Sequence, residues 1–168
     1  HVNGEYKGLY VDVEQVDKAF LTDHGIDNGG WLFKVNEQRT REGEPNPYAF
    51  NWYPFDHPTN PPEVPPPPDW REQAAVRVDI PHLLTLAAVE IFTGNTDGLI
   101  SDMHNYWYYD WALFPEGQQP RLYMPWDLDT TLRNRVTTMP LLGEGRGHIR
   151  EALIVAEPTF QSQYYTFM

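Results

Sequence analysis

Acidic and amide side chains gather between residues 94 and 129 of this 168-residue chain. They are Asp97, Asp102, Asn105, Asp127 and Asp129. Carboxylate oxygens are preferred ligands of hard cations, and Mg²⁺ commonly takes one or two of them together with substrate phosphate oxygens. The set therefore fits a metal–nucleotide site. Asp and Asn are also favoured in turns and helix caps, so spacing alone leaves that interpretation open as well.

One helix and one hairpin must position these side chains. The helix is predicted over residues 79–93, with Asp79 as its cap, a wide apolar stripe, and Gly94 at its end. An aromatic, strand-like segment follows at 105–111, and a second segment returns at 121–124. The acids then lie at the ends of two adjacent elements.

The rest of the chain supplies further elements. Asn3-Gly4 predicts a hairpin turn, and the period-two pattern behind it predicts a strand that reaches Val13. Further predicted elements are a short helix over residues 16–23, a strand over 31–35, and helices near 149–155 and 158–168. Prolines and aromatic residues fill 36–70, which predicts a long loop. The order of helices and strands indicates an α+β fold.

Composition excludes several classes of function. The chain has 12 Lys+Arg against 24 Asp+Glu, a formal net charge of −12, which opposes nonspecific binding to nucleic acid or to an anionic membrane. It has no cysteine, so a disulfide framework, a thiolate nucleophile and a thiolate zinc site are excluded. No apolar run approaches the roughly 20 residues of a membrane-spanning helix.

Several blocks of sequence follow one another in a fixed order along the chain. They are VNGEYKGLY (2–10), EQVD (14–17), FL (20–21), GWLFK (30–34), GNTDG (94–98), HNYWY (104–108), PWDLD (125–129) and the helical segment 149–164. Taken together, these blocks resemble the CotH kinase-like family, which is named for spore coat protein H. The resemblance covers most of the chain outside the proline-rich loop.

The resemblance implies an atypical protein-kinase-like fold that binds ATP with Mg²⁺ and phosphorylates serine in a protein substrate, such as a coat or surface protein. Asp97 would be the catalytic-loop acid, with Asp102 as its rival. Asn105 and Asp127 would be metal ligands, assisted by Asp129. Phosphoryl transfer asks a protein mainly for positioning and charge neutralisation, which such a set can provide.

The resemblance also implies a nucleotide site. The segment at Glu14 and Gln15 would be the interlobe hinge, with backbone groups facing an adenine, whereas an ordinary strand-to-helix turn is the alternative. Lys34 follows an apolar strand, where it could reach a phosphate or an acid, or simply be solvated. The expected organisation is residues 1–35 as the end of the small lobe and the hinge, 36–70 as an inserted loop, and 71–168 as the large lobe.

The sequence also departs from the family pattern. It lacks the basic segment and lysine expected before Asn3-Gly4, and Leu132-Arg133 stands where the family often has Phe-Gly. We therefore expect a kinase-like core truncated at both ends, with little or no kinase activity as a fragment even where its full-length parent is active. The expected location is extracellular or on the cell or spore surface.

Two other functions fit the residues. A catalytically inactive module of the same fold could serve adhesion or surface assembly, with the aromatic loop at 45–70 as its contact surface. Residues 23–34 partly match a calcium loop of the EF-hand type. However, the sixth position of that loop is Asn28 rather than glycine and the twelfth is Lys34 rather than glutamate.

Overall fold

A computed structural model describes residues 3–6, 14–35, 41–42, 68–111, 120–132, 149–155 and 157–168. The predicted strand through Val13 and the loop at 36–70 lie largely outside these residues, as does the tip of the predicted hairpin at 112–119. Within the described part of the chain, no helix combines the length and the apolar character needed to cross a membrane.

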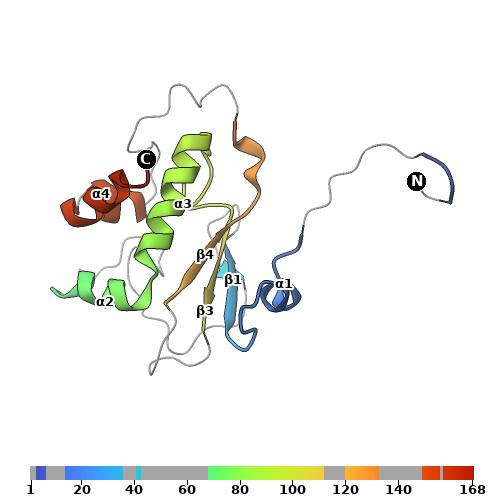
Figure 1. The fold of residues 1–168 in the computed structure, drawn as a ribbon, viewed down its shortest axis with the longest axis horizontal. Coiled ribbons are helices and arrows are strands. Elements are labelled where there is room, and N and C mark those ends of the chain that lie inside the picture. The colour runs from blue at the N-terminus through green and yellow to red at the C-terminus, as the bar shows by residue number, and fades with distance from the viewer. Residues whose placement is uncertain are drawn as a thin grey trace.

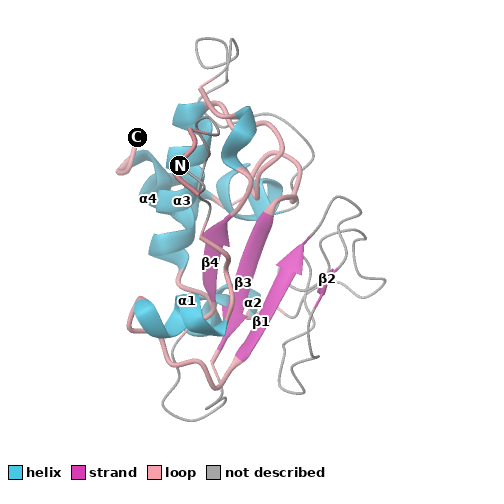
Figure 2. Cartoon of the chain, turned by 90° about the vertical axis from the view of Figure 1, so that its right-hand side faces the viewer, coloured by secondary structure: helices cyan, strands magenta, loops and turns pink. Residues whose placement is uncertain are grey.

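An antiparallel sheet forms the centre of the fold, with strand order β2-β1-β3-β4 (Figure 2). Its body is β1 (Trp31–Val35), β3 (Tyr106–Asp110) and β4 (Leu122–Pro125), and β2 (Arg41–Glu42) adds a two-residue edge. β3 therefore pairs on both sides, with β1 and with β4.

Helices cover one face of the sheet and bury the larger core. These are α2 (Trp70–Arg77), α3 (Ile80–Thr93) and α4 (Pro158–Tyr165), with a π-helical segment η2 (Arg150–Val155) before α4. They lie to one side of the sheet in Figure 1. Apolar residues of α3 pack there against side chains from β1, β3 and β4. These side chains are Phe33, Val35, Tyr106, Tyr108 and Tyr123.

The opposite face packs against the short helix α1 (Lys18–Asp23) (Figure 1). Side chains alternate across a strand, so the neighbours of the core residues in β3 point the other way. Tyr109 of β3 and Met124 of β4 form a second cluster there with Val16 and Leu21, and Trp107 packs at its edge. The sheet is thus covered on both faces.

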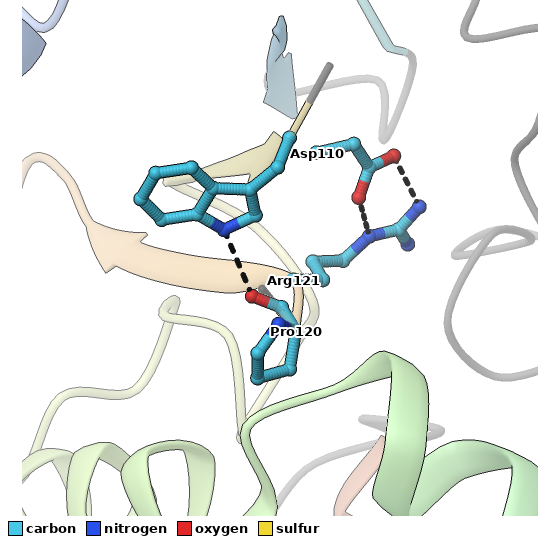
Figure 3. A network of polar contacts seen from close by, with 4 residues as sticks. Asp110, Pro120 and Arg121 are labelled. Carbon is cyan, nitrogen blue, oxygen red and sulfur yellow. Dashed lines mark hydrogen bonds and ion pairs between the residues drawn. The ribbon is translucent and has the colours of Figure 1, made fainter. Parts of the chain in front are cut away.

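A buried ion pair joins Asp110, the last residue of β3, to Arg121, the residue before β4 (Figure 3). Arg121 donates through Nε to Asp110 Oδ1 at 2.5 Å and through Nη2 to Oδ2 at 2.7 Å. The Arg121 backbone N–H also donates to the Arg77 carbonyl at 2.7 Å. One residue therefore joins the sheet to the end of α2.

Most predicted elements are confirmed. The main helix begins after Asp79, whose carboxylate accepts from the His82 N–H at 2.9 Å, and ends at Gly94 with φ of 68°. Asn3 and Gly4 have φ of 51° and 84°, as the predicted turn requires. The residues after α1 lead into strand β1 rather than a second helix, so the calcium-loop interpretation of residues 23–34 is wrong.

Candidate functional site

The candidate site includes the C-terminal end of α3 and the loop that follows it, residues 95–105. Gly94 closes the helix in a left-handed conformation, and its N–H donates to the Ile91 carbonyl at 3.1 Å. The Asn95 N–H donates to the Glu90 carbonyl at 2.9 Å. The chain therefore leaves the helix in one fixed direction, and the loop 95–105 returns from it to the start of β3.

The pairing of β3 with β4 brings a second loop to the same place. Tyr106 is opposite Pro125, so the residues just outside the pair, Asn105 and Trp126, also face each other. The Trp126 N–H donates to the Asn105 carbonyl at 2.8 Å. The segment that carries Asp127 is thus tied directly to the residue that precedes β3.

Asp97 lies in the first of these loops and is contacted by residues of both. Its Oδ2 accepts from the Asn105 side-chain amide at 3.2 Å, and its Oδ1 lies 2.6 Å from the Thr130 hydroxyl. Asn105 is 9% exposed, and Asp97 is half-buried. Two polar contacts from different loops thus fix the orientation of the Asp97 carboxylate. The sequence predicted that Asp97 and Asn105 would lie together, and they are hydrogen-bonded.

A buried carboxylate supports the loop from behind. Glu90 Oε2 accepts from the Ile100 N–H at 2.9 Å, and Oε1 accepts from the Leu99 N–H at 3.2 Å and from the Asn95 amide at 3.4 Å. Burial raises the pKa of Glu90 to about 7, against the lowering effect of these three donors, and the nearby Asp97 adds to the rise.

Left-handed backbone occurs at three non-glycine residues around Asp97. Met103, Asn105 and Asp127 have φ of 53°, 51° and 50°. Such conformations carry a conformational cost and persist where the surrounding structure holds them, often at functional sites. Asn and Asp tolerate this region better than most residues, so the residue types at 105 and 127 match the backbone that the site imposes.

The predicted metal ligands Asp127 and Asp129, and the rival acid Asp102, lie on the two loops described above. Asp127 and Asp129 are exposed on and just before the 3₁₀ turn η1 (Leu128–Thr130), and Asp102 is half-buried. Among the described residues, no group of three or more His, Cys, Asp or Glu side chains is placed to hold a metal ion. A Mg²⁺ ion that takes one or two carboxylates, an amide oxygen and phosphate oxygens does not require such a group, so these residues fit it.

The predicted hinge residues lie at the other covered face of the sheet. Gln15 lines an open cavity of about 600 Å³ with Asp17, Gly30, Trp31 and Trp107. Glu14 is exposed, and its Oε2 lies 4.0 Å from Nε2 of His24. In the described part of the chain, neither Glu14 nor Gln15 is hydrogen-bonded to Asp97, Asn105 or Thr130.

Lys34 lies between the cavity and the Asp127 loop. Its ammonium is 5.6 Å from the centre of the Trp107 ring and 5.3 Å from that of Trp126. The two indoles meet edge to face, with centres 6.2 Å apart. Trp107 lines the cavity and Trp126 precedes Asp127, so these rings connect the two regions.

Three polar residues of the site were not predicted from the sequence. Glu90 had a signal, because it is a charged residue within the apolar stripe of a helix, where a satisfied buried carboxylate is unusual. Asn95 and Thr130 had none, because their roles depend on the approach of two loops that are 35 residues apart along the chain.

Comparison with protein families shows which family the chain belongs to. A model of the CotH kinase protein family matches residues 1–168, the whole chain. No curated protein and no solved structure matches the chain.

Proposed function

Because the chain belongs to the CotH kinase protein family, we propose that it acts in ATP- and Mg²⁺-dependent transfer of the γ-phosphoryl group to serine hydroxyls of a protein substrate. The proposal places the described helices and sheet in a kinase-like core. It also takes the substrate to be a coat or surface protein and the setting to be extracellular or at a cell or spore surface.

The orientation of Asp97 is the observation that carries the proposal. Its two oxygens are engaged by Asn105 and Thr130, which belong to different loops. A carboxylate held in this way can accept the hydrogen bond of an incoming serine hydroxyl and aim its oxygen at the phosphorus. The proton of that hydroxyl then passes to Asp97 as the new P–O bond forms and the bond to ADP breaks.

Mg²⁺ would be held by Asp127 and the side-chain oxygen of Asn105, with Asp129 assisting. The Asn105 amide donates to Asp97 through nitrogen, which leaves its oxygen as a ligand atom. A bound Mg²⁺ supplies neutralisation of the phosphate charge. The chain contributes the placement, because the hydrogen bond from Trp126 to Asn105 fixes the Asp127 loop beside the amide.

The nucleotide would lie toward Glu14, Gln15 and Lys34. The cavity at Gln15 has two tryptophan walls, which suit a flat aromatic base. Lys34 stands between that cavity and the Asp127 loop, where its ammonium is placed to meet phosphate oxygens. A base at one end and a metal-bound phosphate at the other would follow the line from Trp107 to Trp126.

Phosphate transfer from γ-labelled ATP to a serine-rich protein tests this proposal in the full-length gene product. Asp97→Asn should lower the rate of transfer about 10²–10⁴-fold but retain Mg²⁺–ATP binding, and Asp127→Asn should weaken the binding itself. Asp69→Asn, an exposed change at the start of α2, is the matched control. Nucleotide binding without transfer to any serine-rich substrate would instead support a binding module of the same fold.

A further inference from the structure

Asp97 is connected to the buried Glu90 by a chain of side chains. Glu90 Oε1 accepts from the Asn95 amide nitrogen at 3.4 Å. Asn95 Oδ1 lies 2.7 Å from the Thr130 hydroxyl, which lies 2.6 Å from Asp97 Oδ1. Asn95 is fully buried, so its side chain is shielded from bulk water.

The Thr130 hydroxyl has one proton and faces two acceptors. It can donate to Asn95 Oδ1 or to Asp97 Oδ1, but not fully to both. An ionised Glu90 only accepts, so the Asn95 amide presents its NH₂ group to Glu90 and its oxygen to Thr130. In that state Asn95 and Asp97 compete for the Thr130 proton.

A protonated Glu90 removes this competition. Its O–H donates to the Asn95 oxygen once the amide turns over, and the Asn95 NH₂ then donates to the Thr130 oxygen. The Thr130 proton is left with one acceptor, the Asp97 carboxylate. The state of Glu90 therefore sets which group Thr130 donates to, through the intervening side chain of Asn95.

We propose that Glu90 is a positioning residue for Asp97, acting through Asn95 and Thr130. This inference rests on the proposed function, in which Asp97 is the catalytic acid. Two features agree with it. A Cβ atom at Gly98 would overlap both Glu90 Oε1 and Asn95 Nδ2, so the loop makes room for this contact. Burial also places the Glu90 pKa at about 7, where both states are populated near neutral pH.

Among the described residues, Asp97 is the charged side chain that acts on Glu90, and it does so from the loop. The other loop residues packed on its carboxylate are Asn95, Gly98, Leu99 and Ile100, which are uncharged. A pH response of the chain of contacts can therefore be followed through Glu90.

Kinetics of the full-length gene product provide the first test. Thr130→Val should lower kcat about 10- to 100-fold and leave the KM for ATP within about twofold, and Thr130→Ser should restore kcat. Wild-type kcat should show a step near pH 7 that is absent in Thr130→Val and in Glu90→Gln. The double variant should be no slower than the slower single variant. A step that persists in Thr130→Val, or losses that multiply, would overturn the proposal.

Nuclear magnetic resonance provides a second test that does not need activity. The side-chain amide signal of Asn95 should move with the titration of the Glu90 carboxyl carbon in the wild type, and the movement should vanish in Glu90→Gln. Glu72→Gln, an exposed change on α2, should leave it intact. An Asn95 signal that ignores Glu90 would refute the chain of contacts even in a protein that transfers no phosphate. Absence of transfer with a coupled Asn95 signal would refute only the proposed function.

Discussion

The Asn105 side-chain amide donates to Asp97 Oδ2 at 3.2 Å, although the two residues are eight positions apart along the chain. The Trp126 N–H donates to the Asn105 carbonyl, and this hydrogen bond fixes the position of Asn105. The proposed acid is therefore aligned by the same residue that would hold the metal. A change at Asn105 should disturb both roles at once, whereas a change at Asp97 should affect only the acid.

We expect Asp97→Asn to lower kcat by about 10²–10⁴-fold, the range for loss of a general base. Asp102→Asn should retain kcat within about tenfold, because Asp97 is the carboxylate that Asn105 and Thr130 orient. Steady-state kinetics of both variants under saturating ATP measure the difference. Full transfer by Asp97→Asn with loss in Asp102→Asn would assign the acid to Asp102.

Lys34→Met should weaken binding of Mg²⁺–ATP about tenfold, because a charge-assisted contact to phosphate oxygens would be lost. Titration calorimetry measures the change. Lys34→Arg keeps the positive charge between Trp107 and Trp126 and should bind close to normally. If Lys34→Met binds as the wild type does but unfolds at lower urea concentration, the lysine serves only its contacts with the two indoles.

The buried Glu90 should make stability depend on pH. Its pKa is about 7 in the folded protein against an ordinary value of 4.5, so the folded state holds the proton more tightly. The contribution of Glu90 to the free energy of unfolding should therefore fall as pH rises from about 4.5 to about 7, by about 3 kcal/mol, and stay level above that.

Urea unfolding at several pH values measures this contribution as the difference between wild type and Glu90→Gln. Glu72→Gln, the exposed control on α2, should follow the wild type throughout. A difference that rises with pH over the same interval would contradict the burial argument.

Arg121→Met should destabilise the fold by about 3–5 kcal/mol, because it leaves the Asp110 carboxylate buried without its partner. The side chains of Arg121 and Asp110 are 1% and 8% exposed. The double variant Asp110→Leu/Arg121→Met should recover most of the loss, since an apolar pair needs no charge compensation. Equal instability of the single and double variants, measured by urea unfolding, would show that the loss comes from packing rather than from the unpaired charge.

Local signals in the sequence predicted the elements well. Asp79 and Gly94 mark the ends of α3 because capping and left-handed closure depend on a few neighbouring residues. The α2 helix was not predicted, because Trp70–Arg77 has no strong apolar stripe and follows a run of prolines. Its position depends on packing against the rest of the core, which a short window of sequence does not contain.

The contact between Asp97 and Asn105 follows from a loop that contains both partners. Asp97 and Asn105 belong to the same short connection, so their meeting follows from the helix and strand on either side. The contact between Asp97 and Thr130 depends on the register of β3 with β4, which the sequence did not specify. The family resemblance singled out the acids, whose roles belong to the proposed function, and the structure adds the contacts of Asp97 with Asn105 and Thr130.

The left-handed backbone at Asn105 and Asp127 changes how a mutational scan of this protein should be interpreted. Most replacements there, alanine included, remove a side chain and also force an unfavourable backbone, so their effects mix two causes. Glycine accepts the backbone and lacks only the side chain. The difference in fitness between glycine and alanine at these two positions therefore separates the chemical role from the conformational one, without any purified protein.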